Sequence, residues 1–173
     1  MKVCIFSWRS HFELGLMKTK LILWSVLWLA GMAVFAVASS QTSAVAVVVS
    51  EGNPVNNLSV SEVRKLFAGE KHSWPGGLPV KLFVRAPGAY ERIVLLKLLG
   101  MSESEYKQYW TSQVFRGDAQ AEPVALFSNG MQREAVAAYP GAVALVIFQD
   151  VKHGMKVVRV DGHMPGEAGY PLN

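Results

Sequence analysis

VKLFVRAPGAYER, residues 80–92, joins a predicted strand to a predicted helix. The strand Val80–Val84 delivers Arg85 to its carboxyl end, and a helix over Tyr90–Leu99 begins shortly afterwards. Gly88 allows the backbone to approach a ligand, and the first N–H groups of a helix have no partners within that helix. The junction therefore predicts an anion-binding turn, because a cationic side chain and a positive helix end lie together. An arginine at a strand end is also commonly a solvated or structurally paired charge. The surrounding sequence is therefore needed to choose between that role and anion binding.

Strand and helix patterns alternate on both sides of this turn. Ala44–Val49 and Ala142–Phe148 are continuous apolar runs, as expected of strands that are buried on both faces. The other predicted elements are a helix from the capping box Ser59/Glu62 through Phe67, a helix from the capping box Ser102/Glu105 through about Phe115, a short apolar segment over 123–127, a helix over 131–139 and a strand over 156–160. The alternation predicts an α/β fold, a helix-flanked sheet with right-handed crossovers.

Several short motifs surround the Arg85 turn in a fixed order. They are Leu-Phe-x-Gly at 66–69, Trp-x-x-Gly at 74–77 and Pro-Gly-Ala at 140–142. With these motifs, the chain resembles the periplasmic phosphate-binding proteins of ABC transporters over most of its length. The resemblance implies a single three-layer α/β lobe of the type 2 periplasmic-binding fold. Its implied central strands are Ala44–Val49, Val80–Val84 and Ala142–Phe148.

The resemblance also implies which residues contact a ligand. The family's phosphate turn reads Arg-x-Asp-Gly-Ser-Gly-Thr, and Arg85 and Gly88 match it here. Pro87 replaces the carboxylate that accepts a proton from phosphate, while Ala89 and Glu91 replace hydroxyl donors. Each lost hydrogen bond to a charged ligand costs about 1.5–3 kcal/mol, so losing two or three weakens binding roughly a hundredfold to ten-thousandfold. We therefore expect weak or altered binding of phosphate or another small oxyanion, with the ligand-binding residues Arg85, Gly88, Ala89, Tyr90 and Ser128.

The amino-terminal part is typical of a secretory signal peptide, residues 1–38. Two lysines precede an apolar run over 21–38, which ends in Ala-Val-Ala. The prediction is a cleaved leader and a periplasmic binding-protein-like domain over 39–173. Met17 is a second candidate for the start of translation. The alternative is a membrane anchor, since roughly 18 apolar residues can just span a bilayer.

Charge and cysteine content narrow the function further. Without residues 1–38, 13 basic and 12 acidic side chains remain, so no basic stripe predicts a nucleic-acid partner. The single cysteine, Cys4, lies in the leader, which leaves the domain without disulfides or thiolate chemistry. About 135 residues are enough for one hydrophobic core, whereas the receptors that the chain resembles have two lobes that close on the ligand.

Neither a catalytic group nor a metal or cofactor site is predicted. The side chains weighed for such roles have no partner at the required spacing, and they are His72, His153, His163, Glu91 and Glu134. A glutamate in the first turn of a helix, as at Glu91, more often interacts with the helix dipole. Trp74 and Trp110 are assigned to core packing rather than to stacking on a ligand.

Three functional hypotheses remain open at this point. The first is a periplasmic binding module of the phosphate-transporter type with weak or altered oxyanion affinity. The second is an interaction or signalling domain of the cell envelope that uses the same lobe without transporting a ligand. Under the first hypothesis, appreciable anion affinity is expected only if a second copy or another protein covers the face at Arg85, Gly88 and Ser128. The third is an enzyme, for which the chain offers no residues.

Overall fold

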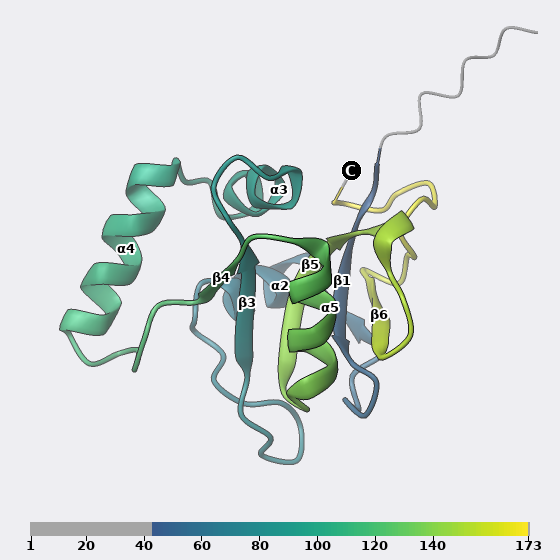
Figure 1. Cartoon of the computed structure of the whole chain (residues 1–173), viewed down its shortest axis with the longest axis horizontal. Coiled ribbons are helices and arrows are strands. Elements are labelled where there is room, and N and C mark those ends of the chain that lie inside the picture. Colours follow the sequence, from purple (N-terminus) through teal and green to yellow (C-terminus); the bar gives the residue numbers. More distant parts are fainter. Residues whose placement is uncertain (1–42, 173) are drawn as a thin grey trace, which may run out of the picture. The chain divides into compact units, whose positions relative to one another are not determined.

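A six-stranded sheet runs through residues 43–172, the part of the chain that the computed structural model describes (Figure 1). The strands are β1 Val45–Ser50, β2 Asn57–Leu58, β3 Lys81–Arg85, β4 Val124–Leu126, β5 Ala142–Ile147 and β6 Met155–Val160, in the order β2-β6-β1-β5-β3-β4. The predicted leader over 1–38 and the alternative start at Met17 lie outside the described residues. No helix within 43–172 has the length and apolar character that a membrane crossing requires.

The three strands predicted as central are neighbours inside the sheet. β1 is antiparallel to both β5 and β6, and β3 is parallel to β5 on its other side. Every residue of β1 is buried, since an apolar run without a polar face is stable only when both faces are covered. β3 is less covered and exposes Lys81, because only the short strand β4 lies beyond it. The predicted limits of these strands differ from the observed ones by no more than one residue at either end.

Helices cover both faces of the sheet, which confirms the predicted three-layer α/β architecture. On one face, the first, third and fifth residues of β1 pack with α2 (Val60–Phe67), α3 (Tyr90–Leu99) and the C-terminal segment. On the other face, Ala46 and Val48 pack with α5 (Asn129–Ala138). Figure 1 shows α5 in front of the sheet and α2 behind it.

Both predicted capping boxes are present, and they begin α2 and α4 (Glu103–Phe115). The helix predicted over 131–139 was placed too late, because α5 already begins at Asn129. Its N-cap is Ser128, whose hydroxyl oxygen accepts a hydrogen bond from the backbone N–H of Met131 at 3.1 Å. Ser128, which the sequence predicts as a ligand-binding residue, therefore also fixes the start of the helix.

Trp74 and Trp110 are buried, as the sequence predicts for core residues. The indole N–H of Trp74 donates to the carbonyl oxygen of Gly141 at 2.9 Å, and a Cβ at Gly141 would lie 1.8 Å from the Pro79 carbonyl oxygen. The ring of Trp110 lies against Gly69, where a Cβ would approach it to 2.5 Å. Packing thus links the Trp-x-x-Gly motif to the Pro-Gly-Ala motif, and the Leu-Phe-x-Gly motif to Trp110.

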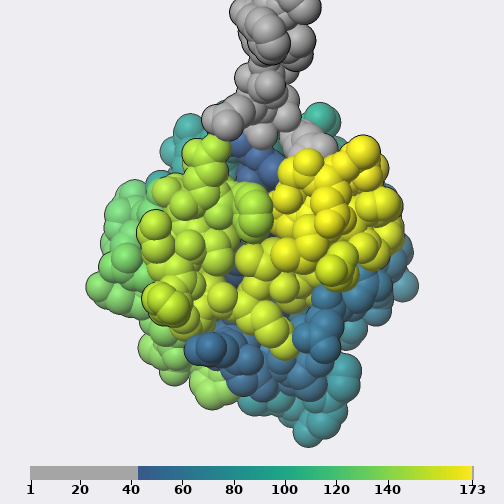
Figure 2. Space-filling model, turned by 90° about the vertical axis from the view of Figure 1, so that its right-hand side faces the viewer, coloured from purple at the N-terminus to yellow at the C-terminus, as the bar shows by residue number. Residues whose placement is uncertain are grey.

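The segment that follows β6 returns across the sheet and is held by β1. The hydroxyl of Tyr170 donates to the carbonyl oxygen of Val45 at 2.7 Å, and the N–H of Val45 donates to the carbonyl oxygen of Leu172 at 3.0 Å. Figure 2 shows this segment, in yellow, spread over one side of the molecule next to the blue early part of the domain.

Candidate functional site

The predicted ligand residues lie where β3, β4 and β5 end and where α3 and α5 begin. Gly88 has φ +88°, a conformation that strongly favours glycine, although an added Cβ would meet no atom within 4 Å. Ala89 is the N-cap of α3 and provides no side-chain cap. The N–H of Arg92 donates to the carbonyl oxygen of Ala89 at 3.0 Å, whereas no side chain caps the N–H groups of Tyr90 and Glu91, as at helix N-termini that bind anions.

Arg85 is already engaged at this edge. One terminal guanidinium nitrogen, Nη1, donates to the carbonyl oxygen of Leu126 at 3.2 Å, and Nε lies 3.6 Å from Oε1 of Glu91. The Arg85 side chain is 13% exposed and that of Glu91 is 3% exposed. The arginine is thus a structurally paired charge, the alternative that the sequence left open. Glu91 is a buried counter-ion, which goes beyond the helix-dipole role expected for it.

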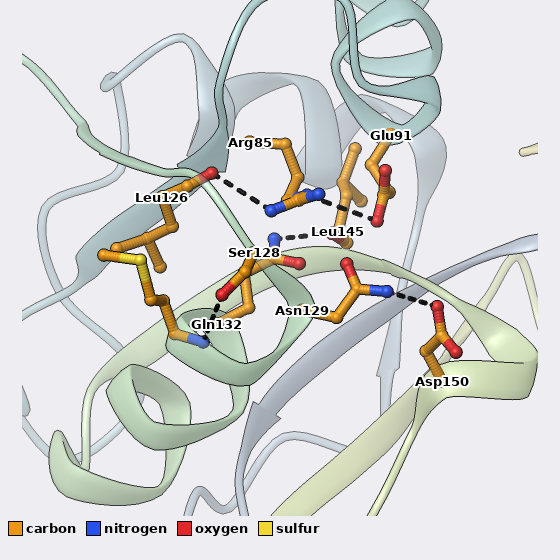
Figure 3. A network of polar contacts seen from close by, with 9 residues as sticks. Arg85, Glu91, Leu126, Ser128, Asn129, Gln132, Leu145 and Asp150 are labelled. Carbon is orange, nitrogen blue, oxygen red and sulfur yellow. Dashed lines mark hydrogen bonds and ion pairs between the residues drawn. The ribbon is translucent and has the colours of Figure 1, made fainter.

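Two amide side chains that the sequence reading missed complete the cluster. Gln132 is fully buried and its Nε2 donates to the carbonyl oxygen of Leu145 at 2.9 Å. Nδ2 of Asn129 donates to a carboxylate oxygen of Asp150 at 2.5 Å. Figure 3 shows the Gln132 amide facing Leu145 and the Asn129 amide facing Asp150, in the same view as Arg85 and Glu91. Gln132 lies one helical turn before Val136 on the buried face of α5. Because residues four positions apart share one face of a helix, this spacing could have identified Gln132 as a buried polar residue.

The five predicted residues therefore come together in two adjacent turns. Arg85, Gly88, Ala89 and Tyr90 form one turn, and Ser128 begins the other; the carbonyl of Leu126 links the two through its bond with Arg85. Ser128 is exposed, and its hydroxyl accepts the capping bond from Met131, so its own proton is available to a further acceptor. The arrangement supplies one guanidinium, one hydroxyl and two helix N-termini.

Large apolar side chains surround this edge and remain exposed. They belong to the first turns of α3 and α5 and to the residues that follow β4 and β5, and they are Tyr90, Ile93, Phe127, Met131 and Phe148. We call them the apolar rim. Phe127 is the most open of them, with 75% of its surface exposed. Such a concentration of apolar surface is typical of a face that another molecule covers.

A cleft of about 580 Å³ lies elsewhere, between the edge of β3 and the segment that follows α4. Its lining includes none of the five predicted ligand residues. The charged groups there do not converge, since Lys81 and His72 are exposed and Asp118 pairs with Arg116 at 2.9 Å. Within residues 43–172, no three His, Cys, Asp or Glu side chains are grouped as a metal ion would require. The edge at Arg85 therefore stays the predicted functional site.

Solved structures of phosphate-transport receptors share this fold. A putative phosphate ABC transporter substrate-binding protein with bound phosphate from Clostridium perfringens is similar at a TM-score of 0.58 and 17% identity, over 70% of this chain and 46% of that one. An ABC-type phosphate transport receptor from Vibrio cholerae is similar at a TM-score of 0.57 and 19% identity, over 70% of this chain and 48% of that chain. PstS from Borrelia burgdorferi is similar at a TM-score of 0.53 and 14% identity, over 70% of this chain and 49% of that chain.

The chain spans about half the length of these neighbours, which fits a single lobe of the type 2 periplasmic-binding fold. At these identities, the likeness establishes the fold. A scan of protein-family models and a search of curated proteins found no match.

Proposed function

We propose that this protein is a periplasmic single-lobe binding module of the substrate-binding-protein type, which binds phosphate or a similar small oxyanion weakly and without catalysis. One observation carries the proposal: Arg85 is held at the end of β3, between the N-termini of α3 and α5. The fold is that of receptors described as phosphate-transport proteins, which supports an oxyanion at this edge.

Three features account for weak binding. The hydroxyl donors of the resembled turn are replaced at Ala89 and Glu91, and Arg85 already faces a carboxylate at 3.6 Å. A binding pocket usually covers about 70–90% of its ligand, whereas a single lobe leaves an anion half in water, where salt screens the guanidinium and the helix ends. We expect dissociation constants of about millimolar or weaker for an isolated monomer.

The proposal includes export. The mature domain would begin near Ser39, after cleavage behind the Ala-Val-Ala sequence. The intact mass of the protein recovered from the periplasm tests this step. A mass that retains residues 21–38 would instead indicate a membrane anchor.

A second candidate is an interaction domain that uses the same edge without transporting a ligand. The apolar rim favours it, because Phe127 and its neighbours expose surface that a small anion does not bury. In this case an envelope protein or a second copy covers the face at Arg85, Gly88 and Ser128. The molar mass in solution, measured across concentrations, tests the homodimer.

Calorimetric titration with phosphate and sulfate tests the first proposal. We expect weak heats from the wild-type protein, lost in Arg85→Ala and retained in Arg133→Ala. The control removes the same charge from an exposed position on α5. Submicromolar binding by a proven monomer would contradict the weak-binding account. Binding that is insensitive to Arg85→Ala would place the site elsewhere.

A further inference from the structure

The pairing of Arg85 with Glu91 is incomplete in a specific way. The 3.6 Å between Nε and Oε1 is longer than a hydrogen bond, and neither atom has another hydrogen-bond partner in the described structure. Both atoms are nevertheless shielded from solvent. Leaving buried groups unpaired is costly, so the cluster retains unused hydrogen-bonding capacity at the place where a ligand is expected.

The amide side chains of Gln132 and Asn129 contribute hydrogen-bond acceptors to this cluster. The partners of Gln132 and Asn129 are a carbonyl and a carboxylate, which only accept, so the amide NH₂ groups must point at them. The amide oxygens, Oε1 and Oδ1, are then turned away from those partners and have none of their own. With Oε1 of Glu91, these oxygens are three unpartnered acceptors in the same cluster as the Arg85 guanidinium (Figure 3). A bare anion that reaches Arg85 therefore meets these acceptors as well as the donors of the edge.

We infer that Glu91 acts as an internal anion, which occupies the charge of Arg85 and sets the low oxyanion affinity of this edge. The inference rests on the proposed function and names the residue that determines its strength. A phosphate brought to Arg85 has to share the guanidinium with a carboxylate that is 3% exposed. Like charges repel strongly when water is excluded, so the buried carboxylate opposes a second anion more than a surface carboxylate does.

Glu91→Gln tests the inference, because it removes the charge and keeps the size of the side chain. Glu134→Gln is the matched control, since it makes the same charge change at an exposed position on α5. Phosphate and sulfate are titrated into each protein, purified after expression of the full chain. We expect Glu91→Gln to bind at least about tenfold more tightly than wild type, as gaining one charged hydrogen bond predicts. The gain should vanish in Arg85→Met/Glu91→Gln.

A stability readout covers the case in which Glu91→Gln folds poorly with Arg85 left unpaired. An anion that binds only the folded state raises the melting temperature, so phosphate should stabilise this variant more than wild type at matched ionic strength. Glu91→Asp keeps the charge and should keep the weak binding. If Glu91→Gln shows neither tighter binding nor a larger thermal shift than Glu134→Gln, the inference is wrong.

The same experiment separates this failure from a failure of the proposed function. Wild-type binding that depends on Arg85 but is unchanged in Glu91→Gln would overturn the role of Glu91 alone. No binding by any variant, Glu91→Gln included, would overturn both. Tighter binding that persists without Arg85 would also overturn the inference, because the anion would then bind elsewhere.

Discussion

Two arginines lie within seven positions of each other, each paired with a glutamate, and the two pairs differ in completeness. Arg92 donates to both carboxylate oxygens of Glu103, at 3.0 and 2.6 Å, and its guanidinium lies 3.9 Å from the ring centre of Tyr106. Arg85 reaches one oxygen of Glu91 at 3.6 Å and leaves that oxygen and its own Nε without a hydrogen bond. Both arginine side chains are largely buried, at 6% and 13% exposure.

The difference shows that an arginine–glutamate ion pair can either stabilise the fold or leave groups free to bind a ligand. The Arg92 pair joins α3 to α4 through two hydrogen bonds. Its carboxylate, Glu103, is 44% exposed, so water can hydrate the lone pairs that Arg92 does not use. Burial raises the pKa of Tyr106 to about 12, which keeps a neutral ring under the guanidinium. The Arg85 pair lies at the end of β3, where helices begin and a ligand is expected. A complete pair stabilises the fold, and an incomplete one has capacity left for binding.

The largest loss of stability is expected when a carboxylate is buried without any partner. This loss sets an upper limit for the losses expected from breaking the two ion pairs. Val146 is buried in β5, in the hydrophobic cluster that also contains Val136 of α5. We expect Val146→Asp to lower the free energy of unfolding by several kcal/mol, about 4 or more. Thermal and urea unfolding measure it. A nearly unchanged melting temperature would show that β5 is not a central strand.

The next effect isolates the Arg85 pair. Arg85→Met leaves the buried Glu91 carboxylate unpaired, which costs about 3 kcal/mol when one member of a buried pair is removed. Arg85→Met/Glu91→Gln removes both charges and should recover most of this loss. Urea unfolding of the wild type and both variants gives the comparison. Equal destabilisation in the single and double variants would mean that the two charges do not interact.

Breaking the complete pair should cost less, although its geometry is better. Arg92→Met removes two charged hydrogen bonds and the contact with Tyr106, but the freed Glu103 can be hydrated because it is partly exposed. We expect a loss of about 2 kcal/mol by the same unfolding measurement. A loss larger than that of Arg85→Met would reverse the comparison and make Arg92 the more critical buried charge.

The smallest effect concerns the pH dependence of the Arg92 pair. The hydrogen bond from Arg92 lowers the pKa of the Glu103 carboxyl below its ordinary 4.5. A carboxyl whose pKa is lowered by folding stabilises the protein above that ordinary value, and the contribution disappears as the pH falls below it. Glu103→Gln should therefore lower stability near pH 7 by about 1 kcal/mol or less, because Glu103 is partly exposed. Melting curves from pH 7 to 3 should converge with those of wild type, and a constant gap would argue against the ion pair.

The sequence predicts the elements better than the site. Apolar runs identify β1 and β5 because nothing along them can face water, and serine–glutamate spacing identifies the starts of α2 and α4. The two-residue strand β2 has too little pattern to be predicted. The buried Gln132 and the contact of Glu91 with Arg85 depend on where helices meet the sheet, which local spacing does not specify.

The central claim is that the edge at Arg85 is the ligand face and that it binds oxyanions weakly. A ¹H–¹⁵N NMR titration of the wild-type protein with phosphate tests it most directly, because each backbone amide reports separately. We expect saturable shifts at residues 86–91 and 128–132, with a dissociation constant of about millimolar, as a half-exposed site predicts. Shifts confined to the cleft beside β3, or submicromolar binding by the monomer, would contradict the account.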